Sequence, residues 1–271
     1  MIARTASTLG LWAAIALAVY FLGAHGGVAL LCLAAAFAQV EVYQMLERIG
    51  YQPRRMAGVA AGVGLLLGSF YLGAVSGSVA LGLGAPALAL AGALAVHIRG
   101  GDDPAPSHAV MATLYGLMLV PGLLLFYVLI VTEAMVGGVP VEGLWIVLWV
   151  VAVVKFADVG ALLTGKFFGK TPLAPSLSPG KTREGVAGGL LASLFVGLLL
   201  AEVLPSAVLG GMGLLSLAAG ALALAGVSVL SDLMESALKR QARVKDSGRI
   251  IPGIGGALDL VDSLLLPAPV A

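Results

Sequence analysis

Charged residues are scarce in this sequence. Asp, Glu, Lys and Arg make up 11% of its 271 residues and 60% are hydrophobic, whereas a soluble domain carries about 25% charged residues. The single cysteine, Cys32, excludes an intramolecular disulfide and a metal site built from several cysteines. The 15 basic and 14 acidic residues nearly cancel, which predicts no nucleic-acid partner. Together with a mean hydropathy of +1.05, this composition indicates an integral membrane protein in a lipid bilayer.

Long apolar stretches recur along the chain, each near the roughly 20 residues that a helix needs to cross a bilayer. We expect an all-α polytopic bundle with eight spans, at residues 8–23, 27–46, 56–75, 78–97, 110–131, 144–163, 186–203 and 211–233. A ninth segment, 264–271, is interrupted by prolines and is too short to cross alone. We interpret the first span as retained, because no convincing signal-peptide cleavage site follows it. One continuous membrane domain is expected, with N-terminal helices in 1–135 and the catalytic half in 136–271.

Basic residues alternate between the expected connections. The connections that begin near residues 47, 99, 164 and 239 contain Lys or Arg, whereas 24–26, 76–77, 132–143 and 201–210 contain neither. Because Lys and Arg are enriched in cytoplasmic loops, this alternation predicts a cytoplasmic N-terminus. It also predicts that the chemistry of the protein takes place on the cytoplasmic side of the membrane.

The N-terminal half offers few polar candidates. Glu41 lies within an apolar span, where a carboxylate is costly unless it is paired. We interpret it as a structural hydrogen-bonding residue, with a functional role as the alternative. His97 and His108 flank a loop that also contains Asp102 and Asp103, but their spacing is not that of metal ligands. We interpret this segment as a solvated loop.

A basic, glycine-containing connection follows the sixth span, in which Lys155 and Asp158 lie one helical turn apart. Residues 178–185 read Ser-Pro-Gly-Lys-Thr-Arg-Glu-Gly, and glycine with lysine is compatible with phosphate binding. A P-loop is excluded, because Pro175 occupies the position of its first glycine and no strand is expected before it. Contact with anionic lipid is the alternative. Glu184 also suits the N-terminus of the helix that follows.

A denser group of polar residues spans 231–246. On a helix, Asp232, Ser236, Lys239 and Arg243 would share one face, which suits a complex of a metal ion with a nucleotide. A glycine-rich turn follows, and then Asp259 and Asp262 lie one helical turn apart. We expect the turn to bring these carboxylates back toward the first. The alternative is an interfacial amphipathic helix with an ion pair between residues 235 and 239.

These residues resemble the signature of the phosphatidate cytidylyltransferases, the CDP-diacylglycerol synthase family. The resemblance is carried by Ser236, Lys239, Arg240, Lys245, Asp246, Pro252, Gly253, Gly255, Gly256, Asp259 and Asp262. It extends upstream to Asp158 and to the Ser178–Gly185 run. Ile254, Leu260 and Arg183 depart from the histidine, arginine and tryptophan of the family pattern. Residues 1–150 share little more than a hydropathy pattern with it.

The resemblance implies that a cytidylyl group passes from CTP to phosphatidate, giving CDP-diacylglycerol and pyrophosphate. It implies Mg²⁺, a second nearby cation, and a bacterial-type inner membrane with the site facing the cytoplasm. We expect catalytic roles for Asp232, Lys239, Asp246 and Asp259. We expect metal ligation by Asp232, Asp259 and Asp262. Substrate binding is assigned to Asp158, Ser178, Lys181, Thr182, Glu184, Ser236, Arg240 and Lys245.

Two other functions remain open from the sequence. One is a related CTP-dependent enzyme that acts on another lipid phosphate or on a lipid alcohol, because Ile254 and Leu260 leave the lipid substrate undetermined. The other is an ion-coupled transporter, since intramembrane Asp and Lys also mark ion paths. The many Gly and Ala residues, together with the resemblance, are compatible with a homodimer.

Overall fold

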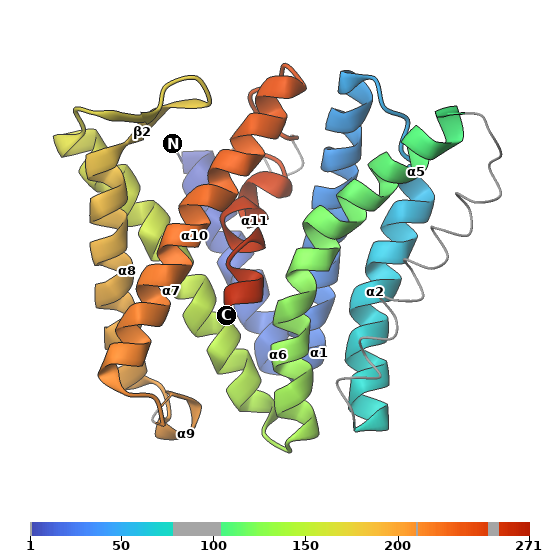
Figure 1. Ribbon diagram of the computed structural model, residues 1–271. Helices are drawn as coiled ribbons and strands as arrows, with labels where there is room; N and C mark the ends of the chain where they lie inside the picture. Colours follow the sequence, from blue (N-terminus) through green and yellow to red (C-terminus); the bar gives the residue numbers. More distant parts are fainter. Residues whose placement is uncertain (1, 78–103, 210, 249–254) are drawn as a thin grey trace. The chain divides into compact units, whose positions relative to one another are not determined.

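The computed structural model describes residues 2–77, 104–209, 211–248 and 255–271, and most of these residues are helical (Figure 1). The chain divides into two compact units. The N-terminal unit comprises Met1–Val141 and Gln241–Val261, and the C-terminal unit comprises Glu142–Arg240 and Asp262–Ala271. The C-terminal tail therefore contributes to both units.

Six helical segments among the described residues are long and apolar enough to cross a membrane. They are Ile15–Ile49, Arg55–Ser76, His108–Val136, Val141–Phe168, Arg183–Val203 and Leu214–Gln241. These segments confirm the predicted all-α membrane protein. The first two expected spans both lie in helix α1 (Ile2–Ile49), which is kinked at Gly23 (φ 56°, ψ −133°). The expected span 78–97 lies outside the described residues, so the predicted total of eight or nine spans remains a prediction.

The N-terminal unit consists of helices packed around buried polar contacts. Its elements are α1, α2 (Arg55–Ser76), α5 (Pro104–Leu117), the π-helical turn η1 (Met118–Gly122) and α6 (Leu123–Val136). The π-helical turn η1 contains Pro121. A proline inside a helix removes a backbone hydrogen bond, which accounts for the wider turn at this point. The Gln39 side chain donates to Tyr43 Oη (2.8 Å) and to the carbonyl of Gly58 on α2 (2.9 Å). The second of these bonds links α1 to α2 inside the unit.

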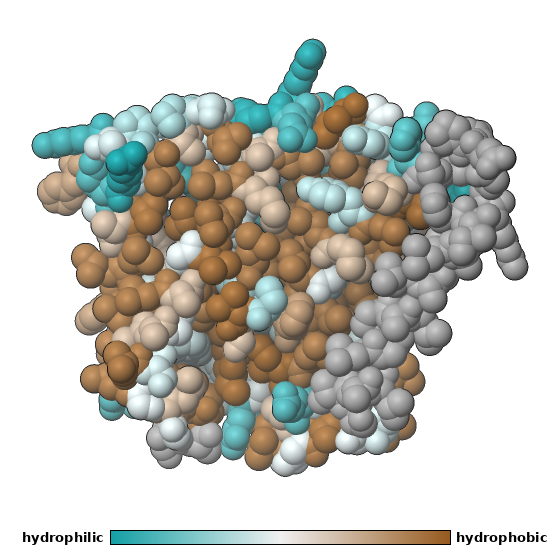
Figure 2. Space-filling model, viewed as in Figure 1, coloured by the Kyte–Doolittle hydropathy of each residue, from teal (hydrophilic) through white to brown (hydrophobic). Residues whose placement is uncertain are grey.

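The C-terminal unit combines three long helices with one small hairpin. Its elements are α7 (Pro140–Phe168), β1 (Pro172–Ala174), β2 (Ser178–Thr182), α8 (Arg183–Val203), α9 (Ser206–Leu209), α10 (Leu214–Gln241), the second half of α11 (Leu258–Leu265) and η2 (Ala268–Val270). Hydrophobic residues cover the sides of α8 and α10, and hydrophilic residues gather around the hairpin (Figure 2). This distribution fits helices surrounded by lipid that carry a polar connection at one end.

Helices α7 and α8 approach each other through small residues. A Cβ atom on Gly160 would lie 2.5 Å from Ala192 Cβ, and one on Gly189 would lie 2.7 Å from the carbonyl oxygen of Ala157. Such close approach is the usual way in which membrane helices gain packing energy. Trp149 Nε1 also donates to the carbonyl of Gly197 at 2.9 Å, which adds a polar tie between the two helices. Helices α7 and α8 are therefore closely packed next to the hairpin that connects them.

The connection between α7 and α8 contains two strands where the sequence predicted none. Strands β1 and β2 pair antiparallel, with Pro172 opposite Thr182 and Ala174 opposite Ser178. Glu184, in the first turn of α8, accepts hydrogen bonds from the backbone N–H groups of Lys170 and Thr171, both at 3.1 Å. These hydrogen bonds fix the two ends of the hairpin. Its prolines and glycine give no alternating pattern of polar and apolar residues, and the strands therefore could not be predicted from the sequence.

Candidate metal and phosphate site

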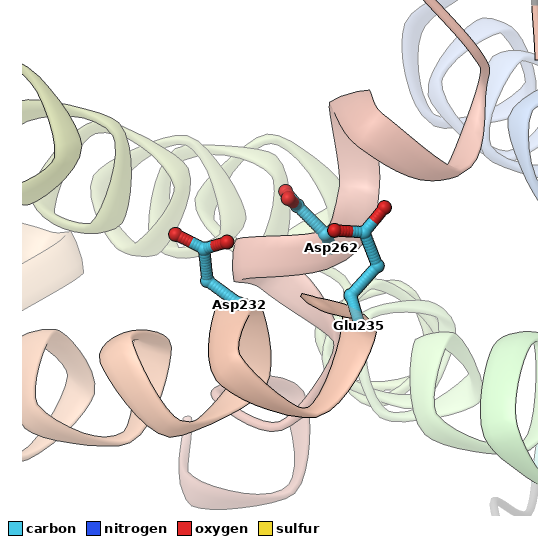
Figure 3. Close-up of side chains that lie close together, drawn as sticks. All are labelled: Asp232, Glu235 and Asp262. Carbon is cyan, nitrogen blue, oxygen red and sulfur yellow. The ribbon is translucent and has the colours of Figure 1, made fainter. Parts of the chain in front are cut away.

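Three carboxylates meet in the C-terminal unit. Asp232 and Glu235 lie one turn apart on α10, and Asp262 lies on α11 (Figure 3). One carboxylate oxygen from each of the three lies within 4.8 Å of the other two. The sequence analysis anticipated Asp232 and Asp262 as neighbours but assigned Glu235 only to an ion pair. Its position three residues after Asp232 was the signal that could have identified it.

Asp262 is held against α10 by the residues next to the acidic cluster. The Ser231 hydroxyl is fully buried and donates to the backbone carbonyl of Asp262. The same hydroxyl oxygen accepts a hydrogen bond from the N–H of Leu266 at 3.2 Å. The N–H of Ser263 donates to Asp262 Oδ1 at 2.6 Å. Hydrogen bonds of the Asp262 carbonyl and of the Ser263 and Leu266 N–H groups therefore fix the position of the Asp262 carboxylate.

Lysine side chains compensate the acidic cluster (Asp232, Glu235 and Asp262). Lys181 on β2 forms an ion pair with Asp232, and Lys239 lies 2.6 Å from Glu235. On α7, Lys155 lies 3.8 Å from Asp158 and donates to the Ser263 hydroxyl at 2.8 Å. Because these cations come from three different elements, the sequence segments 155–158, 178–185 and 231–239 converge on one polar region.

The electrostatics of the cluster favour a bound cation. Burial is the main reason that the pKa of the Asp262 carboxyl is raised, to about 7. Lys155 and the backbone N–H of Ser263 lower this pKa, and the carboxylates of Asp232 and Asp158 contribute to the rise. Carboxylates that repel one another in this way are stabilised by a cation between them. Oxygen atoms are also the ligands preferred by Mg²⁺ and Ca²⁺. The acidic cluster therefore fits a hard divalent ion in its chemistry and in the spacing of its oxygens.

A cavity of about 270 Å³ opens beside Asp232. Its polar wall contains Asp158, Lys181, Thr182 and Asp232. The remainder is mainly apolar, with Leu162, Val186, Leu190 and Val229 from α7, α8 and α10. Such a lining suits a molecule that has a charged head and an apolar tail.

Several predicted substrate-binding residues have structural partners. The Thr182 hydroxyl oxygen accepts a hydrogen bond from the N–H of Gly185 at 3.1 Å and caps α8. Arg240 Nε donates to the carbonyl of Leu177 at 3.1 Å, which ties the end of α10 to the hairpin. Ser178 lies at the start of β2 and Ser236 on α10. The binding roles of all four, and of Glu184, remain predictions.

The expected helical face of α10 is shorter than the sequence suggested. Helix α10 ends at Gln241, and Arg243 has φ 56°, outside the helical region. The prediction that Arg243 shares a helical face with Asp232 and Ser236 is therefore wrong. The chain leaves the helix in a left-handed turn before Lys245, and both Lys245 and the following Asp246 are exposed in the N-terminal unit.

Asp259 has hydrogen-bond partners in the N-terminal unit. Its Oδ2 accepts a hydrogen bond from the Gly256 N–H at 2.8 Å, and the Ser247 Oγ lies 3.0 Å from the same oxygen. Its pairing with Asp232 around one cation therefore remains a prediction. The signature residues Pro252, Gly253 and Ile254 lie outside the described residues, as do His97, Asp102 and Asp103. His108 is exposed but lies within helix α5, so its interpretation as part of a loop is wrong.

The comparisons with known proteins agree with the sequence resemblance. Three curated relatives are phosphatidate cytidylyltransferases. The protein from Haemophilus influenzae is 42% identical over 130 residues, which cover 48% of this chain and 45% of the relative. The one from Helicobacter pylori is 45% identical over 129 residues (45% of this chain, 44% of the relative). The one from Brucella suis is 44% identical over 126 residues (46% and 45%). The alignments thus span about half the length of these relatives.

A sequence model described as "Cytidylyltransferase family" matches residues 2–271. This match includes the helices of both units and the acidic cluster. The chain therefore belongs to the cytidylyltransferase family.

Proposed function

We propose that this protein transfers the cytidylyl group of CTP to phosphatidate, producing CDP-diacylglycerol and pyrophosphate. The observation that carries the proposal is the acidic cluster, whose Asp232 also lines a largely apolar cavity. Family membership points to the nucleotide, and the cavity points to a lipid acceptor. A soluble nucleotide and a membrane lipid could then meet at one polar region.

Mg²⁺ is the cation that we propose for the acidic cluster, with Asp232, Glu235 and Asp262 as its ligands. Asp259 is proposed as a further ligand, and a second cation is expected nearby. When bound, the ion would supply positive charge to the triphosphate of CTP. The three carboxylates would fix its place, and Ser231 would keep Asp262 oriented through the backbone.

The lysines would act on the phosphates directly. In the proposed reaction, a phosphate oxygen of phosphatidate forms a bond to the α-phosphorus of CTP. The bond from that phosphorus to the bridging oxygen breaks, and pyrophosphate leaves with the electron pair. Lys181 and Lys239, which lie beside carboxylates of the acidic cluster, would neutralise the charge of phosphates bound there. Lys155 would hold Asp158 and Ser263 in position.

This reaction does not require a dedicated general base. A phosphate monoester has a second pKa near 6 and is therefore largely a dianion at neutral pH. Catalysis then depends on orientation and on charge neutralisation. The isoleucine at position 254, where the family pattern has histidine, is compatible with such a mechanism.

For the membrane arrangement we propose eight spans, including residues 78–97, with the N-terminus and the acidic cluster on the cytoplasmic side of a bacterial inner membrane. The alternation of basic and non-basic connections supports this orientation. A homodimer is proposed from the many small residues of the chain, which permit close helix contacts.

The test uses purified protein in detergent with phosphatidate, Mg²⁺ and CTP that is radiolabelled at the α- or at the γ-phosphate. The proposal predicts label in the organic phase from α-labelled CTP alone. Label from γ-labelled CTP alone would instead indicate a lipid kinase. Solute flux in proteoliposomes without nucleotide turnover would favour a transporter. Either of the last two results would overturn the proposed function.

A further inference from the structure

Glu41 is a buried carboxylate that binds a segment more than 200 residues away in the sequence. It lies on α1, and its exposed fraction is 1%. Its Oε1 accepts a hydrogen bond from the N–H of Ala257 at 2.9 Å. Its Oε2 accepts from the N–H of Leu258 at 2.8 Å and from the Ser247 hydroxyl at 2.8 Å. All of these residues belong to the N-terminal unit.

The same serine connects Glu41 to Asp259. Ser247 Oγ lies 2.8 Å from Glu41 Oε2 and 3.0 Å from Asp259 Oδ2. Asp259 Oδ2 also accepts hydrogen bonds from the N–H of Ser247 at 3.4 Å and from the N–H of Gly256 at 2.8 Å, and Gly256 directly precedes the two backbone groups that Glu41 holds. Glu41 thus fixes both the serine beside the Asp259 carboxylate and the backbone that leads into α11.

Two glycines make room for the Glu41 carboxylate. A Cβ on Gly248 would lie 2.1 Å from Glu41 Oε1, and one on Gly256 would lie 2.4 Å from Glu41 Oε2. Any larger residue at either position would collide with the carboxylate. A buried carboxylate is costly without hydrogen bonds, whereas an apolar side chain could fill the same space without that cost. Among the described residues, the hydrogen bonds that offset this cost come from Ser247, Ala257 and Leu258, which all precede Asp259 in the chain.

We propose that Glu41 is a positioning residue for Asp259: it orders Ser247 and the first residues of α11, and thereby sets where the Asp259 carboxylate lies. This inference rests on the proposed function in one respect, since the role of Asp259 as a cation ligand is part of that function. The positioning contact itself is a property of the N-terminal unit alone.

The first test is hydrogen exchange, measured by mass spectrometry on the full chain in detergent. Glu41→Gln keeps the shape of the side chain but turns one oxygen into an NH₂ group, which cannot accept from a backbone N–H. Loss of a hydrogen bond to a charged group predicts exchange roughly 10- to 100-fold faster in peptides covering residues 255–260. Peptides from α8 and α10 should be unchanged.

Gln39→Leu is the matched control. Gln39 is also buried on α1, two residues from Glu41, but it bonds to Tyr43 and Gly58 rather than to the segment near Asp259. It should leave exchange at 255–260 within twofold of the wild type. Unchanged exchange in Glu41→Gln, or equal acceleration in Gln39→Leu, would overturn the inference. This part of the test needs no turnover, so it decides the positioning claim even if the protein does not use CTP.

The second test measures the Mg²⁺ concentration that gives half-maximal activity. Positioning of Asp259 predicts an increase of at least fivefold in Glu41→Gln and in Ser247→Ala, with no shift in Gln39→Leu. A purely structural role would lower the amount of active protein without shifting this concentration, and would contradict the inference. If Glu41→Gln does not fold, Ser247→Ala still tests the bridge, because it removes the shared hydroxyl and leaves the two backbone bonds to Glu41 intact; an unchanged Mg²⁺ concentration in this variant would overturn the inference.

Discussion

Glu235 provides a sharp test of the acidic cluster, because the sequence alone suggested only an ion pair for it. Its residue exposure is 3%, it lies 2.6 Å from Lys239, and one of its oxygens lies within 4.8 Å of oxygens of Asp232 and Asp262. Glu235→Gln keeps the volume and removes one negative charge. Loss of one charge-stabilising group in an active site costs about 2.7–4 kcal/mol, which is about 100- to 1,000-fold in kcat.

Stability and activity can be separated at this position. Removing one partner of a buried ion pair destabilises a protein by about 3–5 kcal/mol, because the other charge is left uncompensated. The double variant Glu235→Gln/Lys239→Met removes both charges and should recover most of the melting temperature without recovering activity. Glu202→Gln, an exposed change in the same unit, is the control and should behave like the wild type. Transfer of α-label by Glu235→Gln within threefold of the wild-type rate would refute a role of Glu235 in metal binding.

Two further predictions concern the hairpin and the α7–α8 contact. Lys181→Met removes the ion-pair partner of Asp232 and should raise the KM for CTP or for the lipid by about 10- to 100-fold. Lys166→Met changes an exposed lysine and should leave the KM unchanged. An unchanged KM for Lys181→Met in steady-state kinetics would contradict the prediction. Gly160→Ala should lower the free energy of unfolding by about 1–3 kcal/mol, because its Cβ would collide with Ala192. Gly226→Ala on α10 has open space and should be neutral or slightly stabilising; equal melting temperatures in detergent for the two variants would contradict the close packing.

Hydropathy was sufficient to predict the long helices among the described residues, because a membrane span must be apolar over its whole length. Six of the described helices meet this condition. The kink at Gly23 also lies next to the connection expected at residues 24–26. The strands of the hairpin could not be predicted in this way, since hydrogen bonds from Lys170 and Thr171 to Glu184 fix its ends. Contacts of that kind leave no periodic pattern in the sequence.

The site was predictable where its residues are neighbours on one helix and much less so elsewhere. Asp232 drew attention because a carboxylate near the end of an apolar span needs a partner, and the structure places Asp262 beside it. Glu235 was assigned to Lys239, since an i,i+4 pair is the usual interpretation of that spacing. The hydrogen-bond partners of Glu41 could not be predicted from the sequence, because they lie 206 to 217 residues away along the chain. Arg243 was misplaced because a helix end without a glycine or proline is hard to locate.

The most direct test of the acidic cluster is to locate the divalent ion itself. Crystals grown with Mn²⁺ in place of Mg²⁺ and with a non-hydrolysable CTP analogue would reveal the ion by its anomalous scattering. We expect an anomalous peak beside the carboxylate oxygens of Asp232, Glu235 and Asp262, and the loss of this peak in Asp232→Asn. A nucleotide-bound crystal with its manganese peak elsewhere, or with none, would contradict the account.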